Sequence, residues 1–479
     1  MHITKEREFF MQQKAVTKEK NPLGYEPVGK LLVRFAVPSI VSMLVNAIYN
    51  IVDQIFIGQG VGYLGNAATT IAFPIVTIML AISTLFGAGG SAYAAIMLGE
   101  KNQEKANKTL CNVFVLLLIS GIAIMVVGLL FMEPLLYAFG AREGTVEYAR
   151  VYTAIILIGS PFSMIGVGLS NLVRTDGNPN LAMYSILAGA VLNTILDPIY
   201  IFVFHWGVAG AAIATITSQM ISAVILMYYF AKKGKMRFCK ADMKLDWRLC
   251  RRISGIGISS CILQMASTVL QIVMNNSLIH YGNLSSAGGG DIALSAMGIV
   301  MKVNMILISF CVGIGVGAQP ILGFNQGARQ PHRIRKTYLL AAGSATIIAT
   351  IGWLVCLIFP EAILSLFEKK NAAFMEFAVR CMRIFLLCVF NAGFQIVSTS
   401  YFQATGQAVK ASILSSLRQI VFLIPLVLTL PLFFGLDGIL YAGACADFLS
   451  GLVVACFVVH EMRSLNRWVH EEGLHEAKA

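Results

Sequence analysis

The sequence predicts an all-α integral membrane protein with twelve transmembrane helices arranged as two pseudo-symmetric lobes of six helices each. Three observations support this fold class: the composition, the spacing of apolar runs and an internal repeat. Hydrophobic residues make up 57% of the 479 residues and charged residues only 13%, and the mean hydropathy is +0.75. Globular cores cannot bury so much apolar surface, so lipid must be the solvent for much of the chain.

Twelve predominantly apolar runs follow a polar, basic amino-terminal tail of 30 residues. A membrane-spanning helix needs about 20 such residues, so each run is long enough to cross the bilayer. The first run is long, contains a proline and is followed by no small-residue cleavage site, so we expect it to stay in the membrane. The runs cover approximately residues 31–57, 65–98, 108–132, 147–173, 180–204, 208–231, 252–280, 291–324, 337–359, 373–402, 408–434 and 436–460.

The distribution of lysine and arginine predicts the orientation. Basic residues concentrate in the tail, between the sixth and seventh runs, and in the short loops after the second and eighth runs. All of these segments lie on one side if the helices alternate, and the positive-inside rule makes that side cytoplasmic. We therefore expect a multi-pass protein of the cell membrane with both termini in the cytoplasm. The expected divisions are a tail over 1–30, a first lobe over 31–232, a linker over 233–250, a second lobe over 251–460 and a second tail over 461–479.

The chain repeats itself at a spacing of roughly 228 residues. The repeat is seen at three pairs of segments: Leu98-Gly99-Glu100 with Gln326-Gly327-Ala328, Arg174-Thr175-Asp176-Gly177 with Gln403-Ala404-Thr405-Gly406, and Gly207-Val208-Ala209-Gly210 with Gly435-Leu436-Asp437-Gly438. With six spans per copy, both copies keep the same orientation in the bilayer. The repeat is therefore parallel, about an axis along the membrane normal, as in two-lobed transporters.

Two carboxylates within the spans of the first half are the leading functional candidates, because ionisable groups are costly in lipid. Counting from the cytoplasmic ends places Asp53 and Asp197 deep, toward the outer face, and Thr215 reaches the same depth from the opposite direction. Asn193 lies one helical turn from Asp197. These four oxygen-bearing side chains suit Na⁺, and two neighbouring acids also suit a proton. The alternative is that each aspartate only hydrogen-bonds a neighbouring helix.

The second half has no acid at the corresponding positions. It offers amides in the seventh run, Lys302 in the eighth, Arg418 in the eleventh and Asp447 in the twelfth as a possible partner for either cation. We interpret these as interhelical pairs or as cavity polarity. The residues expected to line a substrate cavity are Tyr49, Asn50, Gln264, Met301 and Lys302.

Several function classes are excluded. The segment Gly24–Lys30 has the spacing of a phosphate-binding loop, but Leu31 replaces the required Ser or Thr and no strand precedes it. There is no H-E-x-x-H motif, and the ten cysteines form no C-x-x-C pair. The net charge of +12 comes from short segments between apolar runs, not from a basic face, so we expect no nucleic-acid partner. We predict neither an enzyme nor a bound cofactor.

These residues resemble the multidrug and toxic compound extrusion (MATE) family, in particular a bacterial drug-exporting branch, over roughly residues 31 to 460. The resemblance rests on Ala36-Val37-Pro38 leading to Tyr49-Asn50-Ile51-Val52-Asp53, Arg174 to Pro179, Asn193 to Pro198, and Gly317-Ala318-Gln319-Pro320 leading to Asn325-Gln326-Gly327-Ala328. It implies lobes in a V, alternating access, and export of small, often cationic and aromatic compounds against H⁺ or Na⁺. We expect the protein to act as a monomer. The resemblance also implies that Asp53, Asn193, Asp197 and Thr215 form the coupling site and hold Na⁺ if sodium couples. Acidic residues that some members use in the seventh and tenth helices are missing.

Two alternatives differ in function. A flippase or exporter of lipid-linked saccharides resembles this fold at superfamily level, but cavity arginines or additional helices would then be expected. A receptor or channel is disfavoured because the repeat covers the whole chain and no pore loop interrupts the spans.

Overall fold

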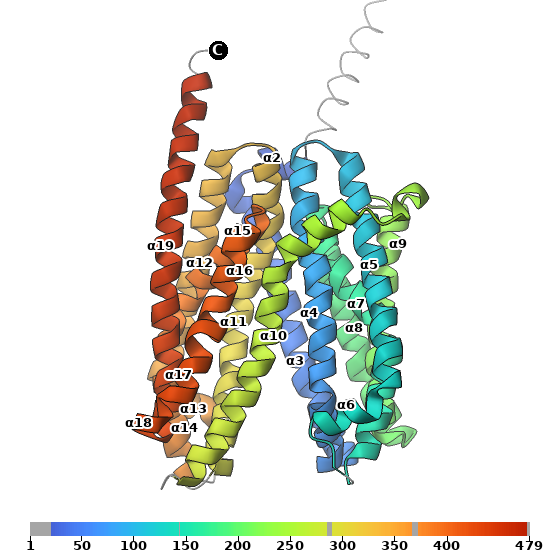
Figure 1. Cartoon of the computed structure of the whole chain (residues 1–479), viewed down its shortest axis with the longest axis vertical. Coiled ribbons are helices and arrows are strands. Elements are labelled where there is room, and N and C mark those ends of the chain that lie inside the picture. The colour runs from blue at the N-terminus through green and yellow to red at the C-terminus, as the bar shows by residue number, and fades with distance from the viewer. Residues whose placement is uncertain (1–20, 143, 285–289, 366–371, 477–479) are drawn as a thin grey trace, which may run out of the picture.

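A computed structural model describes residues 21–142, 144–284, 290–365 and 372–476, and these residues form helices and turns without a strand. Figure 1 shows two groups of helices that run side by side, with α2 and the end of α19 at the same end of the molecule. We call this end the terminal end. The first lobe comprises α2 (Pro22–Tyr25), α3 (Val28–Val61), α4 (Tyr63–Gly99), α5 (Gln103–Leu130), α6 (Met132–Ala138), α7 (Val146–Thr175), α8 (Pro179–Pro198), a π-helical segment (Ile199–Val203) and α9 (Gly207–Lys232).

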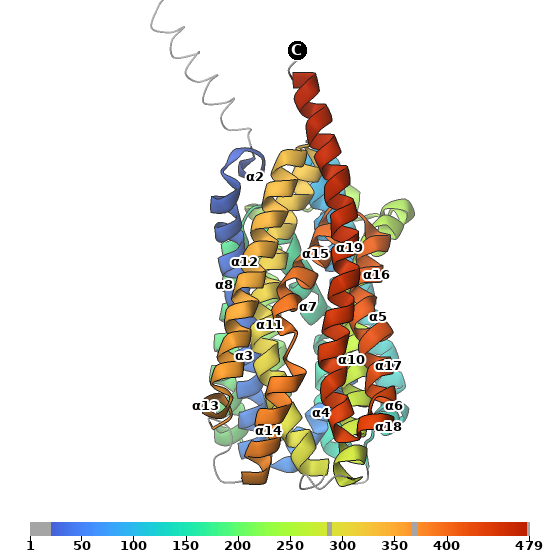
Figure 2. The same cartoon turned by 90° about the vertical axis from the view of Figure 1, so that its left-hand side faces the viewer.

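The second lobe follows a short 3₁₀ turn (Lys240–Met243). In Figure 2, which looks onto this lobe, α19 runs along the whole height and extends beyond its neighbours at the terminal end. The lobe comprises α10 (Trp247–Leu284), α11 (Gly290–Gly327), α12 (Pro331–Ile358), α13 (Pro360–Leu364), α14 (Ala372–Phe385), a 3₁₀ turn (Val389–Asn391), α15 (Ala392–Ala404), α16 (Ala408–Ser416), a π-helical segment (Leu417–Leu423), α17 (Ile424–Thr429), α18 (Pro431–Phe434) and α19 (Leu436–Glu476).

The number of spans agrees with the sequence. Within the described ranges, eleven helices are long and apolar enough to cross a membrane. A twelfth span is formed if the pair 374–385 and 389–404, bent by 44°, crosses as one. The two longest apolar runs become α4 and α11, of 37 and 38 residues, which exceed the length that a bilayer requires.

The repeat is visible in the backbone. Left-handed backbone conformations recur in pairs 228 or 229 residues apart: Lys101 with Arg329, Gly177 with Gly406, and Gly207 with Gly435. Such conformations end helices and turn the chain, so the two lobes reverse direction at equivalent places. Hydrogen bonds repeat as well: Ser91 pairs with Thr175 at 2.8 Å, and the residues 228 positions further along, Gln319 and Gln403, pair at 3.1 Å. This confirms the predicted pseudo-symmetry.

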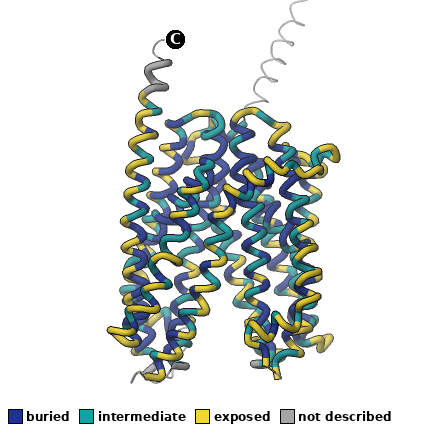
Figure 3. The backbone as a smooth tube through the Cα atoms, viewed as in Figure 1, coloured by how far each residue is buried: buried dark blue, intermediate teal, exposed yellow. Residues whose placement is uncertain are grey.

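The lobes meet toward the terminal end and diverge toward the other, which gives the expected V (Figures 1 and 3). Glycines allow the backbones to touch there. A Cβ atom added to Gly257 of α10 would lie 1.8 Å from the carbonyl oxygen of Leu85 in α4, and one added to Gly327 of α11 would lie 1.9 Å from that of Ile96. We call this region, where α4 meets α10 and α11, the lobe contact. Only residues without a side chain permit so close an approach.

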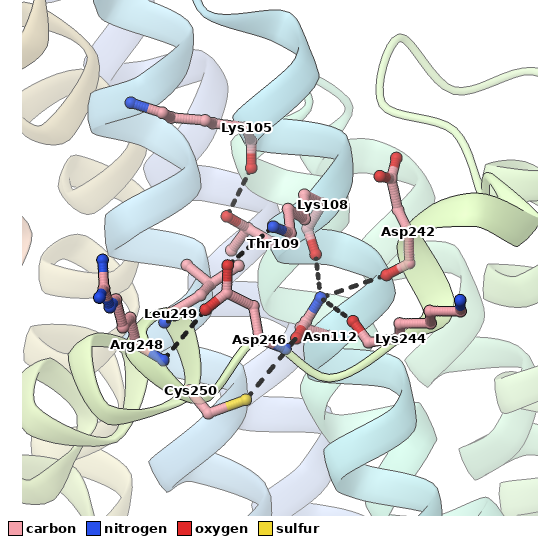
Figure 4. A network of polar contacts seen from close by, with 10 residues as sticks. All are labelled: Lys105, Lys108, Thr109, Asn112, Asp242, Lys244, Asp246, Arg248, Leu249 and Cys250. Atoms are coloured by element: carbon pink, nitrogen blue, oxygen red, sulfur yellow. Dashed lines mark hydrogen bonds and ion pairs between the residues drawn. The ribbon is translucent and has the colours of Figure 1, made fainter.

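The segment between the lobes is fastened to the first lobe (Figure 4). Lys108 of α5 donates to the Asp246 carboxylate at 2.7 Å, and Asn112 donates to the carbonyl of Asp242 at 3.2 Å and accepts from the Asp246 backbone N–H at 2.9 Å. Asp176, just after α7, accepts from the backbone N–H groups of residues 235 and 236, both at 2.8 Å. The segment is therefore held against α5 and the end of α7 of the first lobe.

Candidate functional site

The two intramembrane acids of the first lobe lie together. Asp53 is two turns from the end of α3, and Asp197 is near the end of α8, where its side chain is completely buried. The carboxyl groups are close enough to share a hydrogen bond when one carries a proton. The rings of Tyr49 and Tyr152 lie near both. Thus the depth that counting along the helices predicts for both acids corresponds to a shared site.

Asn193 connects this acid pair to α9. Its side-chain amide donates to Asp197 Oδ1 at 3.2 Å and lies 3.4 Å from the hydroxyl of Thr215. The four residues predicted for the coupling site, Asp53, Asn193, Asp197 and Thr215, are therefore brought together from three helices. Oxygen atoms of three of them, Asp53 Oδ1, Asp197 Oδ2 and Asn193 Oδ1, are enclosed and receive no hydrogen bond from the described residues.

The local backbone explains how α8 presents its acid. Pro198 follows Asp197 directly, and the α-helix gives way there to the π-helical segment Ile199–Val203. Proline removes a backbone donor, and π-helical turns inside α-helices are frequent at functional sites. Gly60 lets α3 approach, because a Cβ atom there would lie 2.1 Å from the side chain of Ile201.

The chemistry of this site follows from its charges. In the described part of the chain neither aspartate forms an ion pair. Two carboxylates in an enclosed place repel each other unless a positive partner compensates them. Oxygen-only ligands suit a hard cation such as Na⁺, and a proton shared between the acids achieves the same neutralisation. The arrangement can therefore bind and release a small cation.

A cavity of about 400 Å³ adjoins the site and lies between the lobes. Of the predicted residues, Tyr49, Asn193, Thr215 and Gln264 line it, together with Gln319 and Gln403 of the second lobe. Asn50, Met301 and Lys302 do not line this cavity: Asn50 donates to the carbonyl of Asn46, Met301 packs against the core of the second lobe, and Lys302 is exposed. Their role in substrate binding stays a prediction.

Arg174 is a cavity residue that the sequence did not single out, although a cavity arginine is the feature expected of the saccharide-exporting alternative. It occupies the last turn of α7, lines the cavity and is 3% exposed. Its position in a motif was the only signal in the sequence, and a basic residue at a helix end is commonplace in membrane proteins. In the second lobe, by contrast, Arg418 forms an ion pair with Asp447, which identifies the partner that the sequence left open.

Comparisons with known proteins agree with this fold. The MatE family model matches residues 38–199 and 259–429, which is more than half of the chain and falls in both lobes. The multidrug export protein MepA of Staphylococcus haemolyticus (strain JCSC1435) is 26% identical over 442 residues, covering 91% of this chain and 94% of that protein. MepA of Staphylococcus aureus (strain MRSA252) is also 26% identical, over 438 residues and with the same coverage of both chains.

Two solved structures share the fold. One is described as the outward-facing conformation of a multidrug resistance MATE family transporter, with a TM-score of 0.86, 22% identity and coverage of 93% of this chain and 98% of that chain. Another, of MATE in the bent conformation, has a TM-score of 0.84 at 22% identity and covers 92% of this chain and 96% of that chain. From the family match to both lobes and the shared fold, we conclude that this chain belongs to the MatE family and is a multi-pass membrane transporter.

Proposed function

We propose that the protein is a secondary active exporter of small organic compounds, cations among them, and that entry of H⁺ or Na⁺ at the Asp53–Asp197 pair drives export. The observation that carries this proposal is a shared side chain. Asn193 bonds Asp197 in the ion site and also lines the cavity. A cation that binds the acids and a compound that fills the cavity therefore act on the same residue, which is what exchange of one for the other requires.

The size and lining of the cavity support a small-molecule substrate. Its volume of about 400 Å³ is in the usual range for drug-sized ligands. Apolar side chains such as Met43, Leu80 and Val316 lie among many residues that carry an amide or a hydroxyl. A mixed lining of this kind binds by apolar burial and tolerates varied compounds.

The experiment that tests this function replaces Asp53 by Asn, which keeps the size of the side chain but removes its charge. We expect export of a fluorescent cationic dye from cells to fall to the level of cells without the protein, at unchanged expression. Glu133→Gln is the matched control, because it neutralises an acid in an exposed pair with Arg150, away from the cavity. Undiminished export by Asp53→Asn would refute the assignment.

The coupling ion needs a second measurement. A pH gradient and a sodium gradient are imposed separately on vesicles that contain the purified protein. One of the two should drive transport of the dye, and that gradient identifies the coupling ion. In both cases Asp53→Asn should remove the response, because both ions would use the same carboxylates. Dye movement that ignores both gradients would contradict secondary active transport.

A further inference from the structure

The cavity contains a buried cation that forms no ion pair with the described residues. Arg174 is the only charged side chain among the described residues that line the cavity, and no Asp or Glu is among them. No acid lies within ion-pair distance of it in the described part of the chain. Nearby Asp176 is engaged elsewhere, by Tyr229 and the backbone of the segment between the lobes. A buried guanidinium without a counter-ion is costly unless another group completes it.

The two unpaired nitrogen atoms of Arg174 have the arrangement that binds a carboxylate. Nη1 of Arg174 donates to Asn171 Oδ1 at 3.2 Å, which fixes the plane of the guanidinium. Nε and Nη2 are enclosed and bond to none of the described residues. These two groups direct parallel N–H bonds to one side of a guanidinium, and this fork matches the two oxygens of a carboxylate.

Ser170 of the same helix supplies a second enclosed donor without a partner among the described residues. Ser170 is one helical turn before Arg174 on α7, also lines the cavity, and its enclosed hydroxyl has no partner among the described residues. A role in stabilising the carboxyl end of α7 accounts for a positive charge at this position. It does not account for two enclosed N–H groups and a hydroxyl that have no partner among the described residues and belong to two residues lining one cavity.

We propose that the cavity recognises compounds that carry a carboxylate, and that Arg174 binds this group through Nε and Nη2 with help from Ser170. The inference rests on the proposed function, because it specifies a chemical class among the exported compounds. It also orients them. Asn193 lies 14 residues, or about 21 Å, along α8 from Pro179, which follows the α7–α8 turn next to Arg174. The anionic end therefore lies toward the terminal end, and a cationic end lies toward the acid pair.

The test compares rhodamine B, which has a free carboxylate, with its ethyl ester, which lacks that charge and keeps the ring system. Binding to the purified protein is measured by fluorescence anisotropy. We expect wild type to bind the acid at least about tenfold more tightly than the ester, as paired bonds to a charged group provide. Arg174→Gln should bring the two affinities to within about threefold of each other and leave ester binding nearly unchanged. Equal wild-type affinities, or an Arg174→Gln variant that keeps the preference, would overturn the proposal.

Two further variants make the result decisive. Arg174→Lys keeps the charge but cannot form two parallel bonds, so it should lose most of the preference even if Arg174→Gln fails to fold. Full preference in Arg174→Lys would overturn the role of the fork. Arg150→Gln removes an exposed arginine outside the cavity and should keep the wild-type preference for the acid over the ester. If Arg150→Gln loses this preference, the assignment to Arg174 is overturned.

The remaining arms separate a carboxylate of the compound from a free anion, and this proposal from the proposed function. Added acetate should displace the acid and leave the ester bound, whereas acetate that strengthens ester binding would overturn the proposal in favour of a free anion. Asp53→Asn should abolish export of both dyes while the binding ratio persists. If wild type binds the acid and the ester equally well while export still depends on Asp53, only the carboxylate site is refuted. If wild type prefers the acid but export does not depend on Asp53, only the proposed function is refuted.

Discussion

The backbone contact at Gly257 offers a sharp test of how the lobes are held together. Substitution by Ala places a Cβ atom 1.8 Å from the carbonyl oxygen of Leu85 and 2.7 Å from its carbon, where ordinary contact begins at 3.4 Å. The obstacle is backbone, so no side-chain rotation relieves it and α10 must move away from α4 by more than an ångström. Overpacking of this kind costs about 1–3 kcal/mol. The conformation with a closed lobe contact should therefore lose population by a factor of about 5 to 150.

Gly255 supplies a matched control on the same helix, because a Cβ atom there meets nothing within 4 Å. Both substitutions gain equally in helix propensity, so this contribution cancels in the comparison. With the exposed Cys445 and Cys456 replaced by Ser, spin labels on Glu104→Cys in α5 and His332→Cys in α12, both exposed at the terminal end, report the distance between the lobes. Gly257→Ala should shift the distance distribution toward longer values, and Gly255→Ala should not. An unchanged distribution in folded Gly257→Ala would refute the reasoning.

Two predictions concern the segment between the lobes. Asn112→Ala removes bonds to the Asp242 carbonyl and the Asp246 N–H, so cleavage by trypsin after Lys240 or Lys244 should accelerate about 5- to 150-fold, the equivalent of about 1–3 kcal/mol; a rate equal to that of wild type would contradict this role. The hydrogen bond from Lys108 holds the pKa of the Asp246 carboxyl below its ordinary value of 3.8. Since the folded pKa is lowered, the stabilisation is present above the ordinary value and is lost as the pH falls through the lowered one. In wild type, cleavage by pepsin near Leu245 should therefore increase only as the pH falls through the lowered pKa of Asp246. In Lys108→Met this increase should begin at a higher pH.

Hydropathy and charge predict most of the fold because a span in lipid must be apolar along its whole length. The bend in the tenth span was not predictable in this way. Residues 373–402 form one apolar run, but α14 ends at Phe385 and α15 starts at Ala392 after a 3₁₀ turn. No proline lies in the run, and its charged residues, Glu376, Arg380 and Arg383, all precede the break. Hydropathy therefore does not locate the break, which depends on how neighbouring helices pack against it.

For the site residues, the sequence predicts depth in the membrane better than the direction in which a side chain points. Counting residues along a helix gives depth, and this was enough to group Asp53 with Asp197. It gives no reliable azimuth: Asn50 follows Tyr49 by one residue, about 100° around α3, and only Tyr49 lines the cavity. Arg174 shows the converse case. Its position at a helix end predicts contact with water, and only the packing of α7 against its neighbours encloses it.

The helix α3 connects the ion site to the contact between the lobes. It carries Asp53 near one end, and nearer the other end it touches α11 of the second lobe, where Cβ atoms on Gly313 and Gly317 would each lie 2.6 Å from the Cα atoms of Ile40 and Ala36. Pro38 lies between these two contacts and removes one backbone hydrogen bond from α3 at this level. A cation that draws Asp53 toward Asp197 therefore acts on a helix with a built-in weak point beside the other lobe. Under the proposed function, coupling of the ion to the lobes would then need only the bending of α3.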